Sequence, residues 1–261
     1  MADTLLSGKT FVVTGGTQGL GRGIALHLAR QGAAGIVICG RNQENGRAAA
    51  QEISEAGGSC AYVRADLAVE ADCRTVVQTA EERFGRVDGL VNAAGLTNRG
   101  TLEDTTVELW DLQFNVNVRA PFILTQETVR IMKHKKIPGS IVNIISDCAH
   151  GGYPYLTAYS ASKGALATFT KNAAHSLRFD RIRVNGICIG WMYTPHEHLV
   201  QVEQEGKPEN WLELVEKEEP FGRILRPQDV ACLAAYLLSD QSEMMTGSLI
   251  DFDQKVIGGL G

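Results

Sequence analysis

The sequence predicts an α/β fold, in which a single domain holds a doubly wound sheet of about seven parallel strands with helices on both faces. Three observations lead to this fold class. Short runs of apolar and β-branched residues alternate with longer stretches of helical periodicity along almost the whole chain. The first such run is followed at once by a glycine-rich turn and a helix. No linker, repeat or low-complexity segment interrupts the 261 residues, so we predict that 1–261 form one domain.

The predicted strands are short buried runs, expected at 10–14, 35–39, 61–65, 88–92, 140–145, 183–189 and 247–252. The predicted helices lie between them, at 22–31, 47–56, 71–84, 106–133, 157–178 and 227–239. The helix over 106–133 contains Asn115 and Asn117. Because Asn is a poor helix former, we expect that one of the two is there for a reason other than helix propensity.

The longest stretch without a predicted strand is 190–222, with two short helical segments near 196–204 and 209–217. An insertion of this length after a strand is typical of a lid over a substrate site. It contains His196 and His198, but side chains at this spacing do not share a helical face, and no third ligand is evident. We therefore predict no metal site.

The composition is that of an ordinary globular protein, with 44% hydrophobic and 21% charged residues. The net charge of −5 argues against a nucleic-acid partner. No apolar run is long enough to span a membrane, and the first residues do not resemble a signal peptide. The six Cys show no metal-binding spacing and are expected to be reduced thiols. These features predict a cytoplasmic protein.

The turn after the first strand has the spacing G-x-x-x-G-x-G, with Gly15, Gly19 and Gly21. Glycine permits a tight turn and a close approach of the backbone to a ligand. The helix that follows offers free N–H groups and a positive dipole end to a pyrophosphate. Because strand, glycine-rich turn and helix occur in this order, a dinucleotide site is favoured over a plain turn.

Residues at the ends of the next two strands bear on which dinucleotide binds. An acid at the end of the second strand selects NAD, whereas this chain has Arg41, which can pair with a 2′-phosphate. NADP is therefore the favoured cofactor, with NAD as the alternative if Arg41 is only a solvated loop residue. Asp66, after the third strand, either caps the next helix or accepts a hydrogen bond from an adenine amine, and the spacing leaves both open.

A phenol and an ammonium lie four residues apart in Tyr159-Ser-Ala-Ser-Lys163, on one face of a predicted helix. An ammonium beside a phenol lowers the pKa of the phenol, which can then exchange a proton with an alcohol or carbonyl oxygen. Taken alone, such a pair is more often a surface Tyr beside a solvated Lys. Ser146 ends the fifth strand and is expected at the sheet edge that Tyr159 also reaches.

In this order and spacing, the motifs resemble those of the classical short-chain dehydrogenase/reductase family, over nearly the whole chain. The resemblance rests on Thr14-Gly15-x-x-x-Gly19-x-Gly21, on Asn92-Ala-Ala-Gly95, on Asn117, and on Ser146 followed by Tyr159-x-x-x-Lys163. It implies a Rossmann-type domain and an NAD(P)-dependent oxidoreductase that interconverts a secondary alcohol and a ketone or aldehyde.

The resemblance also implies a role for each matching residue. Tyr159 is expected to be the general acid/base, and Lys163 to lower its pKa and hold the nicotinamide ribose. Ser146 is expected to bind the substrate oxygen, and Asn117 to anchor a water in the proton relay. Cofactor contacts are expected from Gly15, Thr17, Gln18, Gly19, Leu20, Gly21, Arg41, Asp66, Leu67, Asn92, Ala93, Tyr159, Lys163 and Thr194.

Three positions depart from the family pattern. Gln18 stands where NADP-preferring members often have Lys or Arg, Ile189-Gly190 where Pro-Gly is usual, and Asp251-Phe-Asp253-Gln254 where many members have Asp-Gly-Gly. The family further implies a homotetramer or homodimer. Aromatic and polar residues of the predicted lid, such as Trp191 and His196, together with Tyr153 before the helix at 157–178, suit a sugar, a polyol or a hydroxyacyl compound, and a plain packing role for the aromatic residues is equally open. The alternative function is a non-catalytic NAD(P)-binding regulatory or structural protein on the same fold.

Overall fold

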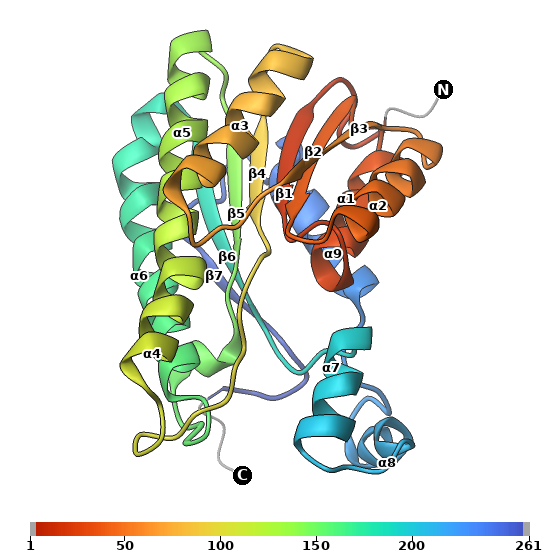
Figure 1. Ribbon diagram of the computed structural model, residues 1–261. Coiled ribbons are helices and arrows are strands. Elements are labelled where there is room, and N and C mark those ends of the chain that lie inside the picture. The colour runs from red at the N-terminus through yellow and green to blue at the C-terminus, as the bar shows by residue number, and fades with distance from the viewer. Residues whose placement is uncertain (1–3, 258–261) are drawn as a thin grey trace.

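The computed structural model describes residues 4–257, which are built around a sheet of seven parallel strands (Figure 1). The strands lie in the order β3-β2-β1-β4-β5-β6-β7, with the switch point of a doubly wound sheet between β1 and β4. This confirms the predicted fold class and strand number. The strand bounds are β1 (Thr10–Thr14), β2 (Gly35–Gly40), β3 (Ser59–Arg64), β4 (Gly89–Asn92), β5 (Ser140–Ile144), β6 (Arg183–Ile189) and β7 (Leu249–Phe252).

The main helices are α1 (Gly19–Arg30), α2 (Gln43–Glu55), α3 (Glu70–Phe84), α4 (Val107–Phe114), α5 (Ala120–Lys135), α6 (Thr157–Leu177) and α9 (Pro227–Leu238). They form one layer on each face of the sheet (Figure 1). Helices α1, α2 and α9 share one buried cluster with the sheet, and α3, α5 and α6 share a second cluster on the opposite face. Within residues 4–257, no helix has the length and hydrophobicity needed to cross a membrane.

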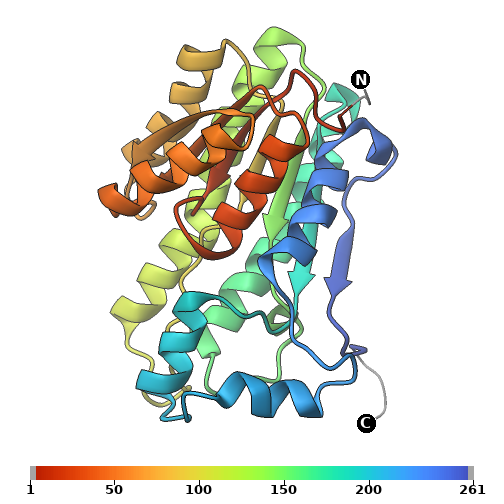
Figure 2. The same cartoon turned by 90° about the vertical axis from the view of Figure 1, so that its right-hand side faces the viewer.

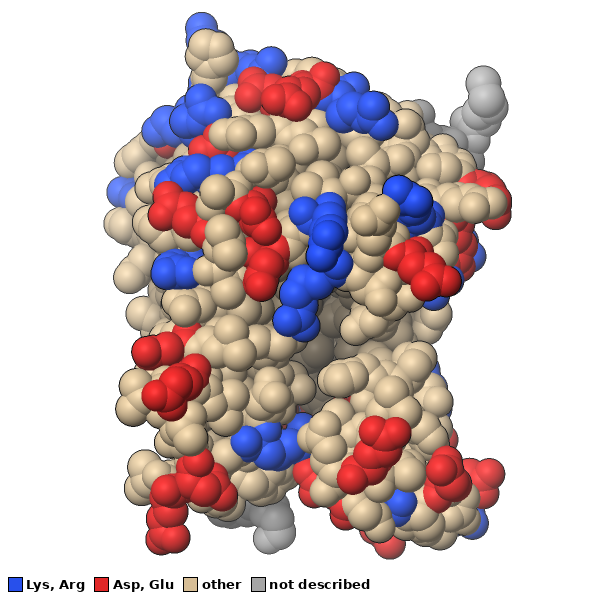
Figure 3. All heavy atoms as spheres, in the orientation of Figure 1, with Lys and Arg blue, Asp and Glu red and all other residues tan. Residues whose placement is uncertain are grey.

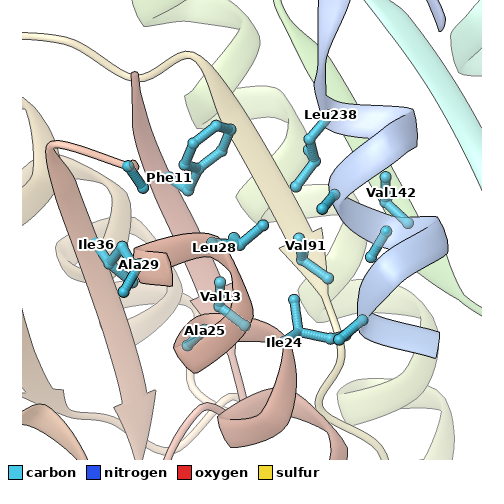
Figure 4. Close-up of a cluster of buried hydrophobic side chains, with 14 of the residues drawn as sticks. Phe11, Val13, Ile24, Ala25, Leu28, Ala29, Ile36, Val91, Val142 and Leu238 are labelled. Atoms are coloured by element: carbon cyan, nitrogen blue, oxygen red, sulfur yellow. The ribbon is translucent and has the colours of Figure 1, made fainter. Parts of the chain in front are cut away.

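The first cluster fixes the position of α1, and with it the turn that precedes this helix (Figure 4). Phe11 and Val13 of β1 pack there with Ile24 of α1, and all three side chains are fully buried. Helices α1 and α9 approach closely, since a Cβ at Gly23 would lie only 2.7 Å from the Cβ of Pro227. The glycine turn is therefore anchored to the core on its helical side.

Two helices begin earlier than their sequence patterns indicate. Helix α1 begins at Gly19, inside the predicted turn, rather than at residue 22. Helix α2 begins at Gln43 rather than at residue 47, because Asn42 supplies a cap: its Oδ1 accepts a hydrogen bond from the Asn45 N–H at 2.9 Å. Hydrophobic periodicity carries no signal for either start, because the first residues of both helices lie outside the apolar pattern.

The helix predicted over 106–133 is interrupted by a π-helical turn, η1 (Asn115–Arg119), between α4 and α5. Asn117 lies in this turn and is fully buried. Such turns inside α-helices are frequent at functional sites. Asn117 is thus the Asn with a role other than helix propensity, as its hydrogen bonds show below.

Residues 190–222 form a lobe beyond the carboxyl edge of the sheet (Figures 1 and 2). It contains α7 (Pro195–Leu199), the π-helical turn η4 (Val200–Gln204) and α8 (Trp211–Glu218), which confirms both predicted helical segments. The chain enters and leaves the lobe side by side. Leu225 N donates to the Trp191 carbonyl at 3.1 Å, and Tyr193 N donates to the Leu225 carbonyl at 2.9 Å.

The lobe has a small aromatic core of its own. Trp211 is 1% exposed and stacks on Trp191, with the ring centroids 5.5 Å apart. The Trp211 indole N–H donates to His198 Nδ1 at 3.1 Å, and His198 Nε2 lies 3.1 Å from a Glu209 carboxylate oxygen. These contacts are all made within the lobe and surround Trp211.

Candidate active site

The segments that carry the predicted functional residues meet at the carboxyl edge of the sheet. The glycine turn follows β1, the turn over 93–95 follows β4, and Ser146 follows β5, with α6 beside them. Parallel strands end at one edge, so residues distant in the sequence converge there. Figure 3 shows the surface hollowed between the main body and the lobe of residues 190–222.

The glycine turn is so compact that side chains are excluded from it. Gly15 and Gly19 have φ angles of +65° and +52°, in the left-handed region that favours glycine. A Cβ at Gly21 would lie 2.5 Å from the Gly15 carbonyl oxygen. Gln18 is the N-cap of α1 but makes no side-chain cap hydrogen bond, and the first turn has no acidic residue. The first N–H groups of α1 are therefore suited to a phosphate.

Thr14 joins this turn to the turn after β4. Its Oγ1 accepts hydrogen bonds from the N–H groups of Ala93 and Ala94, at 3.0 and 3.1 Å. Thr17 and Leu20 are buried beside the same turn, whereas Gln18 is exposed. The sequence motif includes Thr14, but spacing along the chain does not reveal its partners.

A cavity of about 400 Å³ lies at the end of β2, lined by Thr17, Gln18, Arg41, Asn42 and Asn45. Arg41 is exposed there, and its side chain makes no hydrogen bond or ion pair with any residue of 4–257. Arg22, by contrast, forms an ion pair with Glu52. Arg41 therefore offers an unengaged guanidinium at the place where the ribose of an adenosine is expected.

Tyr62 supports this turn and was not singled out from the sequence. Its hydroxyl donates to the carbonyls of Gly40 and Asn42, at 2.9 and 3.2 Å, on either side of Arg41. Its position follows from the pairing of β3 with β2, in which Tyr62 lies next to Ile38. From the sequence alone, Tyr62 could not be told apart from any other Tyr in a strand.

Asp66 does not cap helix α3, so that interpretation is wrong. The N-cap of α3 is Val69, which makes no side-chain cap hydrogen bond. The Asp66 carboxylate accepts from the Ala68 N–H at 3.0 Å, and this bond closes the turn before the helix. Leu67 is buried beneath the same turn. Contact of Asp66 and Leu67 with an adenine remains a prediction.

Asn92 is a buried structural residue at the end of β4. Its Nδ2 donates to Asn143 Oδ1 at 2.8 Å, and Asn143 Nδ2 donates to Thr170 Oγ1 at 2.8 Å. This chain of amides links β4, β5 and α6. The Asn92 side chain points into the protein, where its Oδ1 is buried and has no hydrogen-bond partner among residues 4–257, so the predicted cofactor contact would come from the backbone.

Tyr159 and Lys163 are buried neighbours on α6, which rules out the interpretation as a surface pair. Tyr159 is 9% exposed and Lys163 is 4% exposed. Lys163 Nζ lies 5.6 Å from the centroid of the Tyr159 ring and donates a hydrogen bond to the Ile144 carbonyl at 2.8 Å. The last residue of β5 thus fixes the ammonium beside the phenol.

The predicted lowering of the Tyr159 pKa is wrong for the protein by itself. Burial raises the pKa of Tyr159 well above its usual value, and the nearby Cys148, Asp147 and Glu197 raise it further. A hydrogen bond with Ser146 acts in the opposite direction. Burial also lowers the pKa of Lys163, to about 8. The loss of hydration outweighs the attraction between the two side chains, because Nζ is bonded to a carbonyl and not to the phenol oxygen.

Asn117 fastens the loop after β4 to the helices. Its Oδ1 accepts from the Leu96 N–H at 2.8 Å, and its Nδ2 donates to the Leu96 carbonyl and to Ser162 Oγ, both at 3.0 Å. An ideal Cβ at Gly95 would lie 3.5 Å from both Asn117 Oδ1 and Lys163 Nζ. Both amide N–H groups are therefore used for structure. The anchoring of a water by Asn117 remains a prediction.

Ser146 is joined to two residues that the sequence did not reveal. Its hydroxyl lies 3.0 Å from Asp147 Oδ1, to which it donates, and it accepts from the Cys148 N–H at 3.2 Å. Asp147 Oδ2 accepts from the Tyr153 hydroxyl at 2.6 Å. The sequence does show an acid, Asp147, directly after Ser146. Only the structure shows that the Asp147 carboxylate turns back to bind the Ser146 hydroxyl.

Two of the three departures from the family pattern are in contact with each other. A Cβ at Gly190 would lie 2.1 Å from Asp253 Cγ, so the Asp253 side chain occupies the space beside Gly190. Its Oδ2 is buried and has no hydrogen-bond partner in the described part of the chain. Thr194 follows and caps α7 through the Glu197 N–H at 3.1 Å. A Cβ at Gly19 would lie 3.7 Å from Thr194, which places Thr194 across from the glycine turn.

His196 and His198 lie in α7, where His198 is held by the contacts with Trp211 and Glu209. A different group, His150, Cys188 and Asp251, has its donor atoms within 4.8 Å of one another. His150 Nε2 lies 2.8 Å from Asp251 Oδ1, so this group is a hydrogen-bonded set at the ends of β5, β6 and β7. It arises from the pairing of Cys188 with Asp251 across β6 and β7, which no sequence spacing indicates.

Comparison with known proteins defines the class to which this fold and site belong. Residues 15–254 match the sequence profile of a family described as enoyl-(acyl carrier protein) reductase. The chain is 38% identical over 247 residues to an NADP-dependent (R)-specific alcohol dehydrogenase from Lentilactobacillus kefiri, and the match covers 93% of this chain and 94% of that protein.

Two solved structures have the same fold. One is a short-chain type dehydrogenase/reductase from Mycobacterium marinum, with a TM-score of 0.86, 29% identity, and coverage of 97% of this chain and 96% of that chain. The other is a variant of actinorhodin polyketide ketoreductase with NADPH, with a TM-score of 0.87, 30% identity, and coverage of 93% and 95%. The chain belongs to the short-chain dehydrogenase/reductase family, as the sequence motifs indicate.

Proposed function

We propose that the protein is an NADP(H)-dependent oxidoreductase that interconverts a secondary alcohol and the matching ketone or aldehyde. The observation that carries this proposal is the burial of Tyr159 and Lys163 beside Ser146, at the edge that the glycine turn also reaches. Burying an ammonium and a phenol costs free energy. A protein that only bound a nucleotide would gain nothing from that cost.

The residues around the glycine turn fit a nicotinamide dinucleotide, which supplies or accepts the hydride when bound. The first turn of α1 would hold the pyrophosphate where Gly15 and Gly21 leave no room for side chains. Arg41 would pair with a 2′-phosphate, because its guanidinium has no partner within residues 4–257. The named NADP dependence of the L. kefiri relative and the NADPH in the actinorhodin ketoreductase structure support this choice over NAD.

In the proposed reaction, the Tyr159 phenol gives a proton to the substrate oxygen during reduction and takes it back during oxidation. Ser146 Oγ would hydrogen-bond with the same oxygen. Because burial raises the pKa of Tyr159, the phenol is protonated at neutral pH and is ready to act as an acid. Lys163 would favour the phenolate once a proton has left, and the Ile144 carbonyl keeps its ammonium in place.

We also propose that the lobe of residues 190–222 acts as the substrate lid. Arg99, in the loop after β4, reaches across to this lobe: its Nε lies 2.7 Å from Glu205 Oε1, and its Nη2 lies 3.9 Å from Glu197 Oε1.

The preference for a sugar, polyol or hydroxyacyl substrate loses part of its support, because two of the aromatic residues behind it are used for packing. Trp191 donates to Glu197 at 2.9 Å and stacks on Trp211, so these aromatic side chains pack the lobe.

A cytoplasmic homodimer or homotetramer assembled through α4, α5 and α6 completes the proposal. Large apolar side chains are exposed along these helices, among them Trp110 on α4 and Phe122 on α5. Phe179, directly after α6, is 85% exposed. Exposed apolar surface of this kind favours association. Sedimentation velocity of Phe122→Glu against the unchanged protein tests the assembly.

The experiment that tests the function combines NADPH binding with turnover. Tyr159→Phe removes the proton donor and keeps the ring, so we expect NADPH binding, followed by fluorescence, to remain while the rate falls by about 10²–10⁴-fold. Tyr155→Phe is the matched control, because Tyr155 is half exposed and lies outside the proposed proton path. NADPH binding with no turnover of any secondary alcohol or ketone would favour the non-catalytic alternative. Equal rates for Tyr159→Phe and the unchanged protein would refute the catalytic role.

A further inference from the structure

Asp147 lies directly behind the proposed catalytic Ser and is 8% exposed. One of its carboxylate oxygens accepts from the Ser146 hydroxyl at 3.0 Å, and the other accepts from the Tyr153 hydroxyl at 2.6 Å. Both partners are neutral. No Lys, Arg or His forms an ion pair with Asp147 within residues 4–257, so its negative charge is buried without a counter-charge.

The contact with Asp147 fixes the direction of the Ser146 hydroxyl. An ionised carboxylate can only accept, so the Ser146 proton points to Asp147. The Ser146 oxygen also accepts from the Cys148 N–H at 3.2 Å. What remains on this oxygen is a lone pair that can accept from the Tyr159 hydroxyl or from a substrate hydroxyl. A chain of hydrogen bonds therefore runs from Ser146 through Asp147 to Tyr153. Tyr159 lies beside it, in one buried cluster with Cys148 against which Tyr153 packs.

We propose that Asp147 is a positioning residue, which orients the Ser146 hydroxyl as a hydrogen-bond acceptor and places a fixed negative charge against the Tyr159 phenol. This proposal rests on the proposed oxidoreductase function. In that reaction, the Ser146 oxygen accepts a hydrogen bond from an alcohol substrate or from Tyr159. It can donate a hydrogen bond to the substrate only when its own proton turns away from Asp147. The charge of Asp147 opposes formation of the Tyr159 phenolate and so adds to burial, which is the main reason that the phenol stays protonated.

None of the other titratable groups that face Tyr159 is a buried anion without a cation nearby. Cys148, in the same turn as Asp147, has a pKa raised to about 11 by burial and is a neutral thiol. Glu197, from α7, also raises the pKa of Tyr159, but Arg99 Nη2 lies 3.9 Å from its Oε1 and offsets part of its charge.

Lys163 is the one cation that faces the phenol among these groups, and it lies on the same helix as Tyr159. Its ammonium favours the phenolate, whereas the Asp147 carboxylate opposes it. On top of the larger effect of burial, the balance between these two charges adjusts the pH at which Tyr159 exchanges its proton. The pH profile of the reaction is therefore the property that Asp147 should control.

The test is Asp147→Asn, which keeps the shape and one acceptor oxygen but removes the charge. Alcohol oxidation needs the Tyr159 phenolate, so its rate rises as the pH passes the pKa of Tyr159. Without the opposing charge that pKa falls. We expect the midpoint of kcat/KM for oxidation to move to lower pH by about half a unit to one unit. The high-pH fall of ketone reduction should move in the same direction.

Two control variants separate charge from packing. Asp251→Asn removes an equivalent charge at the ends of the strands, where Asp251 pairs with His150, and should leave the midpoint in place. Tyr153→Phe removes one of the two hydrogen bonds of Asp147 but keeps its charge. It should lower kcat through a looser Ser146 and leave the midpoint near that of the unchanged protein.

A spectrophotometric titration of the phenol, taken as the difference from Tyr159→Phe, gives a readout that does not need turnover. The same downward shift in Asp147→Asn supports the proposal. An unchanged midpoint in an active Asp147→Asn enzyme overturns it and leaves the proposed function standing. An equal shift in Asp251→Asn also overturns it, because the effect would then be one of net charge. Absence of turnover in the unchanged protein would instead count against the proposed function.

Discussion

Replacing Asn117 with Ala tests whether this side chain holds the loop after β4 in place. The amide joins the π turn to both backbone groups of Leu96 and to Ser162 Oγ, at distances of 2.8–3.0 Å. Asn117 is fully buried. Alanine therefore removes three hydrogen bonds and leaves a small space where water has no direct access from the surface.

The magnitude follows from the groups left without partners. An unsatisfied buried donor or acceptor costs about 1–3 kcal/mol, and the deleted side-chain volume adds to this. Leu96 is only half buried, so water can reach part of its backbone. Ser162 keeps its bond to the Tyr159 carbonyl at 2.7 Å. We expect a loss of about 2–4 kcal/mol in the free energy of unfolding, a large part of the stability of an ordinary domain.

The assay is urea denaturation followed by circular dichroism. Asn115→Ala is the matched control, since Asn115 lies in the same π turn and its side chain makes no hydrogen bond with residues 4–257. Both substitutions raise helix propensity, so their difference isolates the hydrogen bonds. Asn117→Asp keeps the acceptor for Leu96 N–H but loses the donors, and it should fall between the two.

A loss below about 1 kcal/mol in Asn117→Ala relative to Asn115→Ala would refute this reasoning, because such a loss is no more than one ordinary hydrogen bond. If activity nevertheless fell, the water-anchoring role would explain Asn117 better than the structural one.

Three further outcomes are expected. Arg41→Ala should weaken NADPH binding by about 10–100-fold, which corresponds to the loss of one charge-assisted hydrogen bond. NADH binding should not change. Equal losses of affinity for both nucleotides would show a non-specific effect. Burial lowers the pKa of Lys163 from 10.5 to about 8, so between these pH values the unfolded chain binds a proton at Lys163 that the folded chain does not. The free energy of unfolding should therefore rise with pH across this window. Urea denaturation of Lys163→Met should lack this rise. Gly190→Ala should destabilise by about 1–3 kcal/mol, since its Cβ would meet Asp253 Cγ, and adding Asp253→Gly should restore most of the loss in thermal denaturation; additive effects would contradict the contact.

The elements of the fold were predictable because a buried parallel strand needs a nearly continuous run of apolar residues, as in Ile36–Cys39 of β2. Element ends were less predictable. The early start of α2 depends on Asn42 capping it, and the π turn at Asn115–Arg119 depends on the tertiary contact of Asn117 with Leu96. Hydrophobic periodicity indicates which side of a helix or strand is buried, but it does not indicate individual hydrogen bonds of this kind.

The candidate site was predictable where its residues recur at fixed spacing, as Tyr159 and Lys163 do on one helical face. The direction of the Tyr159 pKa was wrong, because spacing shows proximity but not burial, and burial dominates here. Asp147 and Tyr62 escaped notice for a related reason. Their partners are fixed by a turn and by strand pairing, and neither residue belongs to a repeating pattern.

The lobe of residues 190–222 is closed at its base by the paired backbone of Trp191, Tyr193 and Leu225, and it folds around Trp211. Its two ends meet at one point of the main body, so its length and sequence can change without moving a strand. We therefore expect the lobe to be exchangeable between relatives as one unit. If it is the substrate lid, grafting it should transfer substrate preference, while Tyr159 and Lys163 on α6 stay with the host.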